Sequence, residues 1–242
     1  VGGASCRLKK ESVLIRLIRE WLKTAVETFL PFSCHVCRSR TSLGEVLCDD
    51  CRRSIKTGMW PPVQVEDVSC RCSVLAMGEY KPPLSDAIKA VKYRPSTRLL
   101  DQLAEDISRV AATLPTAQRP EILIPVPLHP EKEAKRGFNQ ARRFADILGT
   151  AWNASISPAI IRIRNTKPQA ECDEEQRATN PAGAFEPAKH LIPAAFAGKR
   201  LAIVDDVATT GATLDACAAA VERLRPASLQ AFVWAHSYRR RG

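Results

Sequence analysis

The chain has 242 residues, of which 45% are hydrophobic and 26% are charged, a composition that excludes a largely disordered protein and a bundle of membrane helices. Its length predicts one domain with an appendage or two small domains. The net charge of +10 favours an anionic partner, which could be a phosphorylated small molecule, a nucleic acid or an anionic membrane surface.

Residues 12–30 predict an amphipathic helix, because apolar residues recur there at helical spacing with charges between them, and Pro31 ends the pattern. The same charges argue against a signal peptide or a transmembrane segment, so we expect a cytoplasmic protein. The helix would pack on its own domain or on a partner, and its Arg and Lys residues leave a membrane surface as the alternative. Residues 1–30 form the first predicted unit.

Two Cys-x-x-Cys pairs follow, Cys34 with Cys37 and Cys48 with Cys51. Each pair can point two thiolates at one ion, so together they predict a structural Zn²⁺ site with four sulfur ligands and no open position for catalysis. A redox role is the alternative, but two pairs this close together are better explained as one site. We assign residues 31–62 to a small zinc-binding domain.

Pro61-Pro62 indicates a linker, after which residues 63–242 form the third predicted unit. Cys70 and Cys72 stand near its start and are interpreted as free thiols, because a single intervening residue fits a zinc knuckle poorly; a degenerate second metal pair is the alternative. The hydrophobic patterns then predict, in order, a strand over 73–80, helices over 84–93 and 98–114, and a strand over 121–127 that ends in prolines.

A basic loop follows this last strand, at the carboxyl edge of the predicted sheet. Lys132, Lys135 and Arg136 could meet a diphosphate there, with the guanidinium of Arg136 offering a bidentate fork. A solvated basic loop is the alternative. A helix is expected behind the loop over residues 141–148, and a short strand over 159–163.

A long polar segment follows over residues 164–184. A polar segment of this length inside a compact domain is typical of a lid. Lys167 and Arg177 would bring positive charge over an anionic substrate, whereas a plain surface hairpin is the alternative.

Residues 201–213, LAIVDDVATTGAT, predict a ligand-binding strand end. Four apolar residues indicate a buried parallel strand, Asp205 and Asp206 stand at its carboxyl end, and a Thr/Gly turn opens an Ala-rich helix over 212–224. The turn offers N–H groups and hydroxyls to a phosphate, and the paired acids suit sugar hydroxyls or Mg²⁺. A last strand is expected over 228–236.

This stretch resembles the signature with which type I phosphoribosyltransferases bind 5-phosphoribosyl-1-diphosphate (PRPP). Together with the four cysteines, the segment from Val126 to Gln140 and the segment from Thr166 to Ala170 with the later Gly183-Ala184-Phe185, it resembles the ComF family over roughly residues 29–236. That family, known as competence protein F, is linked to the uptake of transforming DNA in bacteria. The resemblance implies an α/β fold, with a type I phosphoribosyltransferase-like parallel sheet flanked by helices behind a zinc-binding domain.

The resemblance also implies roles for individual residues. Asp205 and Asp206 would face the ribose hydroxyls, and the loop over residues 127–136 would hold the diphosphate with Mg²⁺. Lys167 would belong to a flexible loop over 164–184. The expected catalytic residues are Asp205, Asp206, Arg136 and Lys167, and the expected PRPP-binding residues are Ala208, Thr209, Thr210, Gly211, Ala212, Thr213, His129 and Lys132.

Two differences from related enzymes narrow the range of possible substrates. Hypoxanthine-guanine enzymes carry an Asp at the position of Thr209, where it serves the purine ring, so salvage of those purines is disfavoured. The strand end Pro125-Val126-Pro127 also resembles glutamine amidophosphoribosyltransferases, which need a glutaminase domain with an N-terminal cysteine nucleophile. Cys6 is not terminal and little sequence precedes the cysteine pairs, so we do not expect glutamine-dependent chemistry.

Two hypotheses of function follow. The first is a Mg²⁺-dependent phosphoribosyltransferase whose acceptor the sequence does not specify. The second is a non-catalytic, zinc-containing DNA-uptake factor that binds single-stranded DNA or partner proteins and uses the phosphoribosyltransferase fold as a nucleotide sensor. The net charge of +10 suits both hypotheses.

Overall fold

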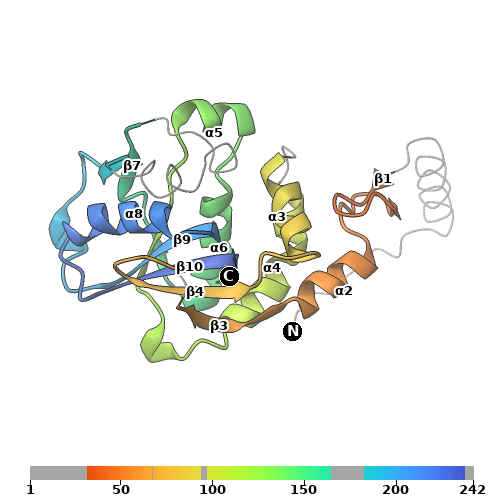
Figure 1. Ribbon diagram of the computed structural model, residues 1–242, viewed down its shortest axis with the longest axis horizontal. Helices are drawn as coiled ribbons and strands as arrows, with labels where there is room; N and C mark the ends of the chain where they lie inside the picture. The colour runs from red at the N-terminus through yellow and green to blue at the C-terminus, as the bar shows by residue number, and fades with distance from the viewer. Residues whose placement is uncertain (1–31, 67, 94–96, 165–182, 238–242) are drawn as a thin grey trace, which may run out of the picture.

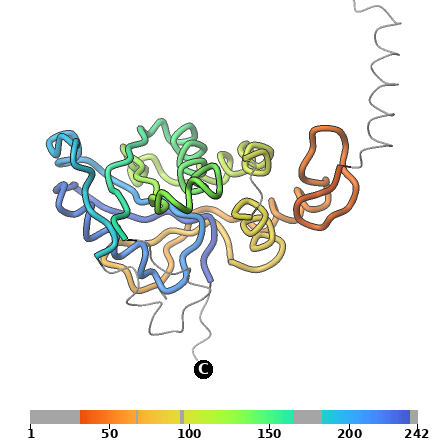
Figure 2. Tube along the Cα trace, turned by 90° about the horizontal axis from the view of Figure 1, so that it is seen from above, coloured from red at the N-terminus to blue at the C-terminus, as the bar shows by residue number. Residues whose placement is uncertain are grey.

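The computed structural model describes residues 32–66, 68–93, 97–164 and 183–237 (Figures 1 and 2). The predicted N-terminal helix over 12–30 lies outside the described residues. So does most of the predicted lid, including Lys167 and Arg177. The predictions for these segments stay predictions.

A six-stranded sheet in the order β3-β4-β10-β9-β5-β6 forms the centre of the fold. β3 runs antiparallel to β4, and the other neighbouring strands of this sheet are parallel to each other. The α/β fold predicted from the sequence is therefore confirmed. The strands are β3 (Met59–Val65), β4 (Ser73–Gly78), β5 (Ile122–Pro125), β6 (Ser155–Ile156), β9 (Arg200–Ala208) and β10 (Ser228–His236).

Helices cover both faces of the sheet, and the alternation of side chains along β9 shows why. Ala202 and Val204 pack with the helices α3 (Leu84–Tyr93), α4 (Arg98–Ala111) and α6 (Gln140–Trp152). Leu201 and Ile203 point to the opposite face and pack with α8 (Ala212–Glu222). A strand buried on both faces needs a continuous apolar run, and this is the pattern that β9 shows before Asp205.

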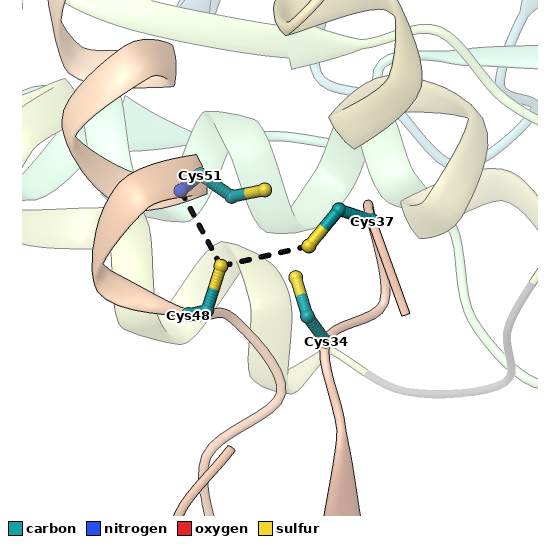
Figure 3. A group of neighbouring side chains, drawn as sticks. All are labelled: Cys34, Cys37, Cys48 and Cys51. Atoms are coloured by element: carbon teal, nitrogen blue, oxygen red, sulfur yellow. Dashed lines mark hydrogen bonds between the residues drawn. The ribbon is translucent and has the colours of Figure 1, made fainter. Parts of the chain in front are cut away.

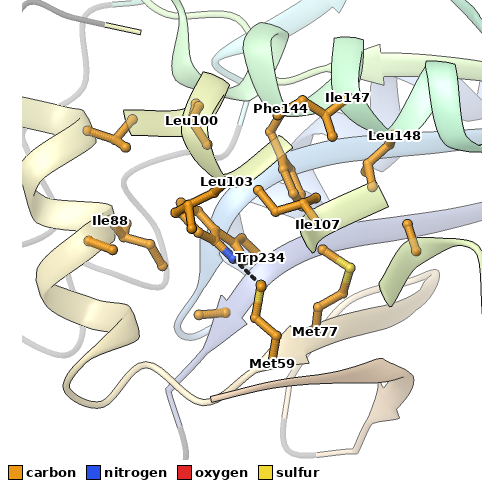
Figure 4. Close-up of a cluster of buried hydrophobic side chains, with 14 of the residues drawn as sticks. Met59, Met77, Ile88, Leu100, Leu103, Ile107, Phe144, Ile147, Leu148 and Trp234 are labelled. Atoms are coloured by element: carbon orange, nitrogen blue, oxygen red, sulfur yellow. Dashed lines mark hydrogen bonds between the residues drawn. The ribbon is translucent and has the colours of Figure 1, made fainter. Parts of the chain in front are cut away.

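Trp234 of β10 is at the centre of the larger core (Figure 4). Leu103 and Ile107 of α4 and Phe144 of α6 surround its ring, and the centroids of the Phe144 and Trp234 rings are 6.1 Å apart. Its indole N–H donates to the sulfur of Met59, at 3.3 Å. Aromatic residues in such a core contribute a large share of the buried apolar area, which fixes the position of β10 between its neighbours.

The cysteine-rich unit lies at one end of the molecule (Figure 1) and comprises β1 (Phe32–Ser33), β2 (Arg40–Thr41) and α2 (Asp49–Thr57). Its buried residue Ile55 belongs to the same core cluster as the residues of α4. Asp106 of α4 is 3% exposed and pairs with Arg52 of α2 at 3.3 Å. The unit is therefore attached to the sheet by a shared apolar core and by an ion pair with a buried carboxylate.

Two elements differ from the sequence prediction. Pro61 and Pro62, predicted as a linker, lie inside β3, so the predicted boundary between residues 62 and 63 falls within this edge strand. The register between β3 and β4 shifts between Met59 and Val63, where prolines cannot donate ladder hydrogen bonds. The predicted loop after β5 contains a helix, α5 (Pro130–Arg136), which begins at a proline and ends at Gly137 in the left-handed conformation (φ +81°).

The remaining elements are short. β7 (Ile160–Arg162) and β8 (Phe185–Pro187) pair antiparallel and flank the segment that was predicted as a lid. Two single turns of 3-10 helix complete the described elements, η1 (Thr116–Gln118) and η3 (Pro193–Ala195).

Candidate functional site

The four predicted zinc ligands come together in the structure (Figure 3). The Sγ atoms of Cys34, Cys37, Cys48 and Cys51 all lie within 4.8 Å of one another, and those of Cys37 and Cys48 are 3.6 Å apart. Thiolates at about 2.3 Å from a tetrahedral zinc ion would stand about 3.8 Å apart, so the spacing fits this ion. The cluster could therefore hold a zinc ion.

Local hydrogen bonds support thiolates in this cluster. The backbone N–H of Val36 donates to Cys34 Sγ at 3.4 Å, and that of Cys51 donates to Cys48 Sγ at 3.5 Å. The hydroxyl of Ser39 lies 3.0 Å from Cys37 Sγ, and hydrogen bonds from Ser39, together with those from Cys51 and Cys48, lower the pKa of Cys37 to about 6. These contacts favour the thiolate, the form that binds a metal, at Cys37 and Cys48, whereas burial and the neighbouring thiols raise the pKa of Cys51.

A second site lies at the carboxyl edge of the sheet, where Asp205 and Asp206 stand near the end of β9. The strand continues for two residues beyond them, to Ala208. Asp206 is 6% exposed, and its backbone N–H donates to Asp205 Oδ1 at 2.8 Å. Its Oδ2 atom is buried and has no hydrogen-bond partner among the described residues. Burial and the neighbouring Asp206 carboxylate raise the pKa of Asp205 to about 7.

Lys92, at the end of α3, reaches these carboxylates, and the sequence analysis did not find it. Its Nζ atom is 3.1 Å from Asp206 Oδ1. Burial acts to lower the pKa of Lys92, but Asp206 and Asp205 outweigh burial and raise it. A signal was available in the sequence, because Lys92 follows the buried Ile88 by four residues and so shares its helix face.

The predicted phosphate turn joins β9 to α8. Gly211 adopts a left-handed conformation (φ +85°) and begins the helix without a side-chain cap, while the hydroxyl of Thr210 accepts a hydrogen bond from the N–H of Ala212 at 3.3 Å. A helix N-terminus presents N–H groups and a positive dipole, which suits an anion. Thr210 and Ala212 also line a cleft of ≈ 490 Å³ that contains the basic residues Arg71 and Arg223.

The end of β5 lies beside the end of β9. Pro125 pairs with Val204, and the N–H of Val126 donates to the carbonyl oxygen of Val204 at 2.9 Å. The side chain of Asn139 ties the far side of α5 to this strand end, because it donates to the carbonyl oxygen of Val126 at 2.9 Å and caps α6. The segment predicted to hold a diphosphate is therefore anchored at both ends to the same edge as Asp205.

The predicted site residues are distributed as follows. His129 precedes α5, and Lys132 and Arg136 lie on this helix, where the guanidinium of Arg136 donates to Gln140. Asp205 and the turn after it lie at the end of the adjacent strand β9. Lys167 lies outside the described residues, so the fourth expected catalytic residue is not placed.

Comparisons with known proteins find relatives that align over almost their whole length. A scan against models of protein families finds no match. The chain is 28% identical to the DNA utilization protein YhgH of Salmonella typhimurium over 228 residues, and 28% identical to competence protein F of Haemophilus influenzae over 225 residues. Both alignments cover 85% of this chain and 96% of the relative. The chain is similar to proteins of the ComF family.

A more distant ComF relative, competence protein ComFC of Bacillus subtilis, is 27% identical over 154 residues, which cover 63% of this chain and 60% of that protein. The resemblance to the ComF family predicted from the sequence is thus confirmed, and the four-cysteine cluster is present in the structure. Within the part of the chain that the structure describes, no helix has both the length and the apolar character needed to cross a bilayer.

Proposed function

We propose that the chain binds PRPP with Mg²⁺ at the carboxyl edge of its sheet and acts as a phosphoribosyltransferase in the uptake or use of DNA. The observation that carries this proposal is the arrangement of β9: the half-buried Asp205, the buried Asp206, a turn at Gly211 and a helix N-terminus follow one another at the edge where open α/β sheets bind ligands. The names of the relatives, competence protein F and DNA utilization protein, support the link to DNA.

Each part of PRPP has a proposed partner. The turn from Ala208 to Thr213 receives the 5-phosphate. The Oδ2 atom of Asp206, which has no partner among the described residues, accepts a hydrogen bond from a ribose hydroxyl. His129, Lys132 and Arg136 contact the diphosphate, where Mg²⁺ would neutralise part of its charge. Lys167 would add positive charge from the segment between β7 and β8.

The reaction that this set of residues supports is displacement of diphosphate from C1 of the ribose. Cationic groups around the diphosphate would stabilise the charge that develops on the leaving group, and the carboxylates would hold the sugar in position. A protein nucleophile is not required. Asp205, next to the buried Asp206, would help to stabilise the positive charge that develops on the ribose.

The test is a screen for diphosphate release from PRPP in the presence of Mg²⁺ and candidate bases and amines. We expect one acceptor to stimulate release in the wild-type protein, and the variant with Asp205→Asn and Asp206→Asn to lose at least about a hundredfold in rate. Wild-type rates that match those of the folded double variant for every acceptor would refute the enzymatic proposal.

A second candidate is a non-catalytic factor that binds single-stranded DNA, which the net charge of +10 and the relatives' names favour. Phosphate contacts release counterions, so binding of a labelled single strand would weaken steeply as salt rises. If transformation is lost on deletion of the gene but survives Asp205→Asn with Asp206→Asn, the DNA-binding role is favoured over the enzyme. Loss of transformation in the folded double variant would favour the enzyme.

A further inference from the structure

Cys70 and Cys72 form a second pair of neighbouring thiols, outside the four-cysteine cluster. Their Sγ atoms are 3.4 Å apart, and the backbone bends at Arg71 and Cys72, just before β4. Both thiols are partly exposed, so a small molecule can reach them. A disulfide has its sulfurs about 2.0 Å apart, which means that the two atoms need to approach by about 1.4 Å.

The residue between the two thiols is bound to α8. The backbone N–H and the Nε of Arg71 both donate to Asp215 Oδ1, at 2.9 and 3.0 Å, and its Nη1 donates to Glu222 at 3.2 Å. Asp215 lies in the first turn of α8, next to the proposed phosphate-binding turn. The position of Arg71 therefore determines how the Cys70–Cys72 segment contacts the start of this helix.

The residues just before Cys70 press directly against that turn. A Cβ atom added to Gly211 would lie 2.6 Å from the carbonyl oxygen of Ser69 and would also clash with the side chain of Val68. The segment 68–72 thus contacts the turn on one side and holds α8 through Arg71 on the other.

The two thiols differ in reactivity. Their mutual hydrogen bond lowers the pKa of Cys70 and raises that of Cys72, so Cys70 is the better nucleophile. Two cysteines separated by one residue close a small ring, and disulfides in strained, exposed positions are the labile and regulatory ones.

We propose that Cys70 and Cys72 are a redox-active dithiol, which closes to a disulfide by exchange with a small-molecule disulfide and loosens the turn at Gly211. The thiolate of Cys70 attacks one sulfur of the small disulfide, forming a mixed disulfide and releasing one thiolate. Cys72 then loses its proton and attacks the sulfur of Cys70, which releases the second thiolate. The two protons of the protein thiols pass to the released thiolates, so the dithiol is oxidised and the small disulfide is reduced to two thiols.

Ring closure turns the backbone at Arg71, which weakens its bonds to Asp215 and moves Ser69 relative to Gly211. The expected consequence for ligand binding, which rests on the proposed function, is an affinity for PRPP about tenfold lower in the oxidised protein. The expected consequence for the turn itself is faster amide exchange at the start of α8, and this needs no ligand.

The experiment uses the full-length zinc-loaded chain, equilibrated at a series of ratios of oxidised to reduced glutathione. Free thiols are trapped with N-ethylmaleimide, and the protein is cleaved after glutamate. Cleavage after Glu66 and Glu79 gives the peptide 67–79, which contains Cys70 and Cys72 and no other cysteine. We expect this peptide to lose two hydrogens and both labels as the buffer becomes oxidising, and to regain them with dithiothreitol.

Three results test, in turn, the closure of the ring, its coupling to the turn at Gly211 and the identity of the partner thiol. A peptide that keeps both labels at every ratio, or carries glutathione without closing the ring, overturns the dithiol. A closed ring without faster exchange over residues 209–216 overturns its coupling to the turn. The variant Cys217→Ala, which lacks the buried thiol of α8, should close the ring like the wild type. A wild-type peptide 67–79 that is instead linked to the peptide containing Cys217 would overturn the pairing of Cys70 with Cys72.

The PRPP arm compares oxidised with reduced protein, beside the variant with Cys70→Ser and Cys72→Ser. We expect the variant to bind PRPP equally at all glutathione ratios, while the wild type responds. A variant that responds as the wild type does would overturn the proposed coupling. If neither protein binds PRPP, the proposed function fails, and the peptide mass and the amide exchange still decide the dithiol.

Discussion

Lys92 places an ammonium group against a carboxylate that is almost fully buried. The Lys92 side chain is 25% exposed and its Nζ is 3.1 Å from Asp206 Oδ1. Removal of one partner of such a pair leaves an uncompensated charge, which costs more than the pair itself contributes. Lys92 is therefore a positioning residue for the carboxylates in this account.

We predict that Lys92→Met lowers the free energy of unfolding by about 1–3 kcal/mol at pH 8, because two adjacent carboxylates then lack their cation. The loss should shrink at pH 5, because Asp205, whose pKa is about 7, is then protonated and adds no second negative charge beside Asp206. Urea unfolding at both pH values measures this. The control is Lys89→Met on the same helix, whose exposed pair with Asp86 at 3.3 Å contributes little. Equal losses in the two variants would contradict the role of Lys92.

Asp205 predicts a pH dependence of stability with a definite sign. Its pKa in the folded chain, about 7, is above the ordinary value of 3.8, so the folded state favours the protonated carboxyl. The associated stability is present below about pH 4 and is lost as the pH rises through 7. Asp205→Asn, which stays neutral, should therefore be more stable than the wild type at pH 8, by about 1–3 kcal/mol, and equal to it at pH 4. Denaturant unfolding against pH provides the measurement.

The control for this variant is Asp86→Asn, on the exposed face of α3. It should follow the wild type within about 0.5 kcal/mol at both pH values. An Asp205→Asn protein that is less stable than the wild type at pH 8 would show that the ionised carboxylate stabilises the fold, contrary to the shift in its pKa.

At the scale of elements, the turn between β9 and α8 depends on Gly211 for two separate reasons. Its φ of +85° is unfavourable for other residues, and the carbonyl of Ser69 leaves no room for a Cβ. Gly137, at the end of α5, has a similar φ of +81° but open space around it. The two glycines therefore separate the cost of the backbone conformation from the cost of the clash.

We predict that Gly137→Ala costs about 1 kcal/mol, the price of the left-handed conformation alone, and that Gly211→Ala costs at least about 2 kcal/mol more. Thermal and urea unfolding of the two variants, measured side by side, provide the test. Similar losses would mean that the segment at Ser69 moves away freely, which would also weaken the proposed coupling of the Cys70–Cys72 pair to this turn.

The elements that were predicted well are those whose own side chains show a clear hydrophobic pattern. The apolar runs of β9 and β10 and the periodic α3 were found because each is decided by its own side chains. α5 was missed although Pro130 begins it, basic residues end it and Gly137 follows it, because a helix of seven residues has too few positions to show a period. β3 was missed because its prolines suit a linker as well as an edge strand.

The site was predicted only in part, for a physical reason. Asp205, Asp206 and the turn are adjacent in sequence, so one motif revealed them together. The contacts of Lys92 with Asp206 and of Ser69 with Gly211 join distant segments, and only the packing of the helices on the sheet creates them. The contact of Arg71 with α8 is of the same kind.

At the scale of the whole molecule, the cysteine cluster and the sheet share one core. Cys34 is fully buried, and it belongs with Ile55 to the cluster that contains Leu103 of α4 and Trp234 of β10. Asp106 adds ion pairs to Arg52 and Lys56 of α2. A change at the metal site should therefore disturb the packing of the helices on that face of the sheet.

We predict that the purified chain contains one zinc ion and that a chelator which removes it lowers the melting temperature by roughly 10 °C or more, since metal binding contributes directly to folding. Elemental analysis and calorimetric melting measure the two effects. Cys37→Ser should behave like the chelated protein, whereas Cys72→Ser should keep its zinc. Full zinc content in Cys37→Ser, or none in the wild type, would contradict the assignment.

The measurement that tests the central proposal most directly is a calorimetric titration of the reduced, zinc-loaded chain with PRPP and Mg²⁺, beside the variant with Asp205→Asn and Asp206→Asn. The account predicts saturable binding of one PRPP per wild-type chain, with affinity at least about tenfold lower in the variant. A folded wild-type chain that gives no heat of binding at millimolar PRPP, or that binds PRPP no better than the variant does, would contradict it.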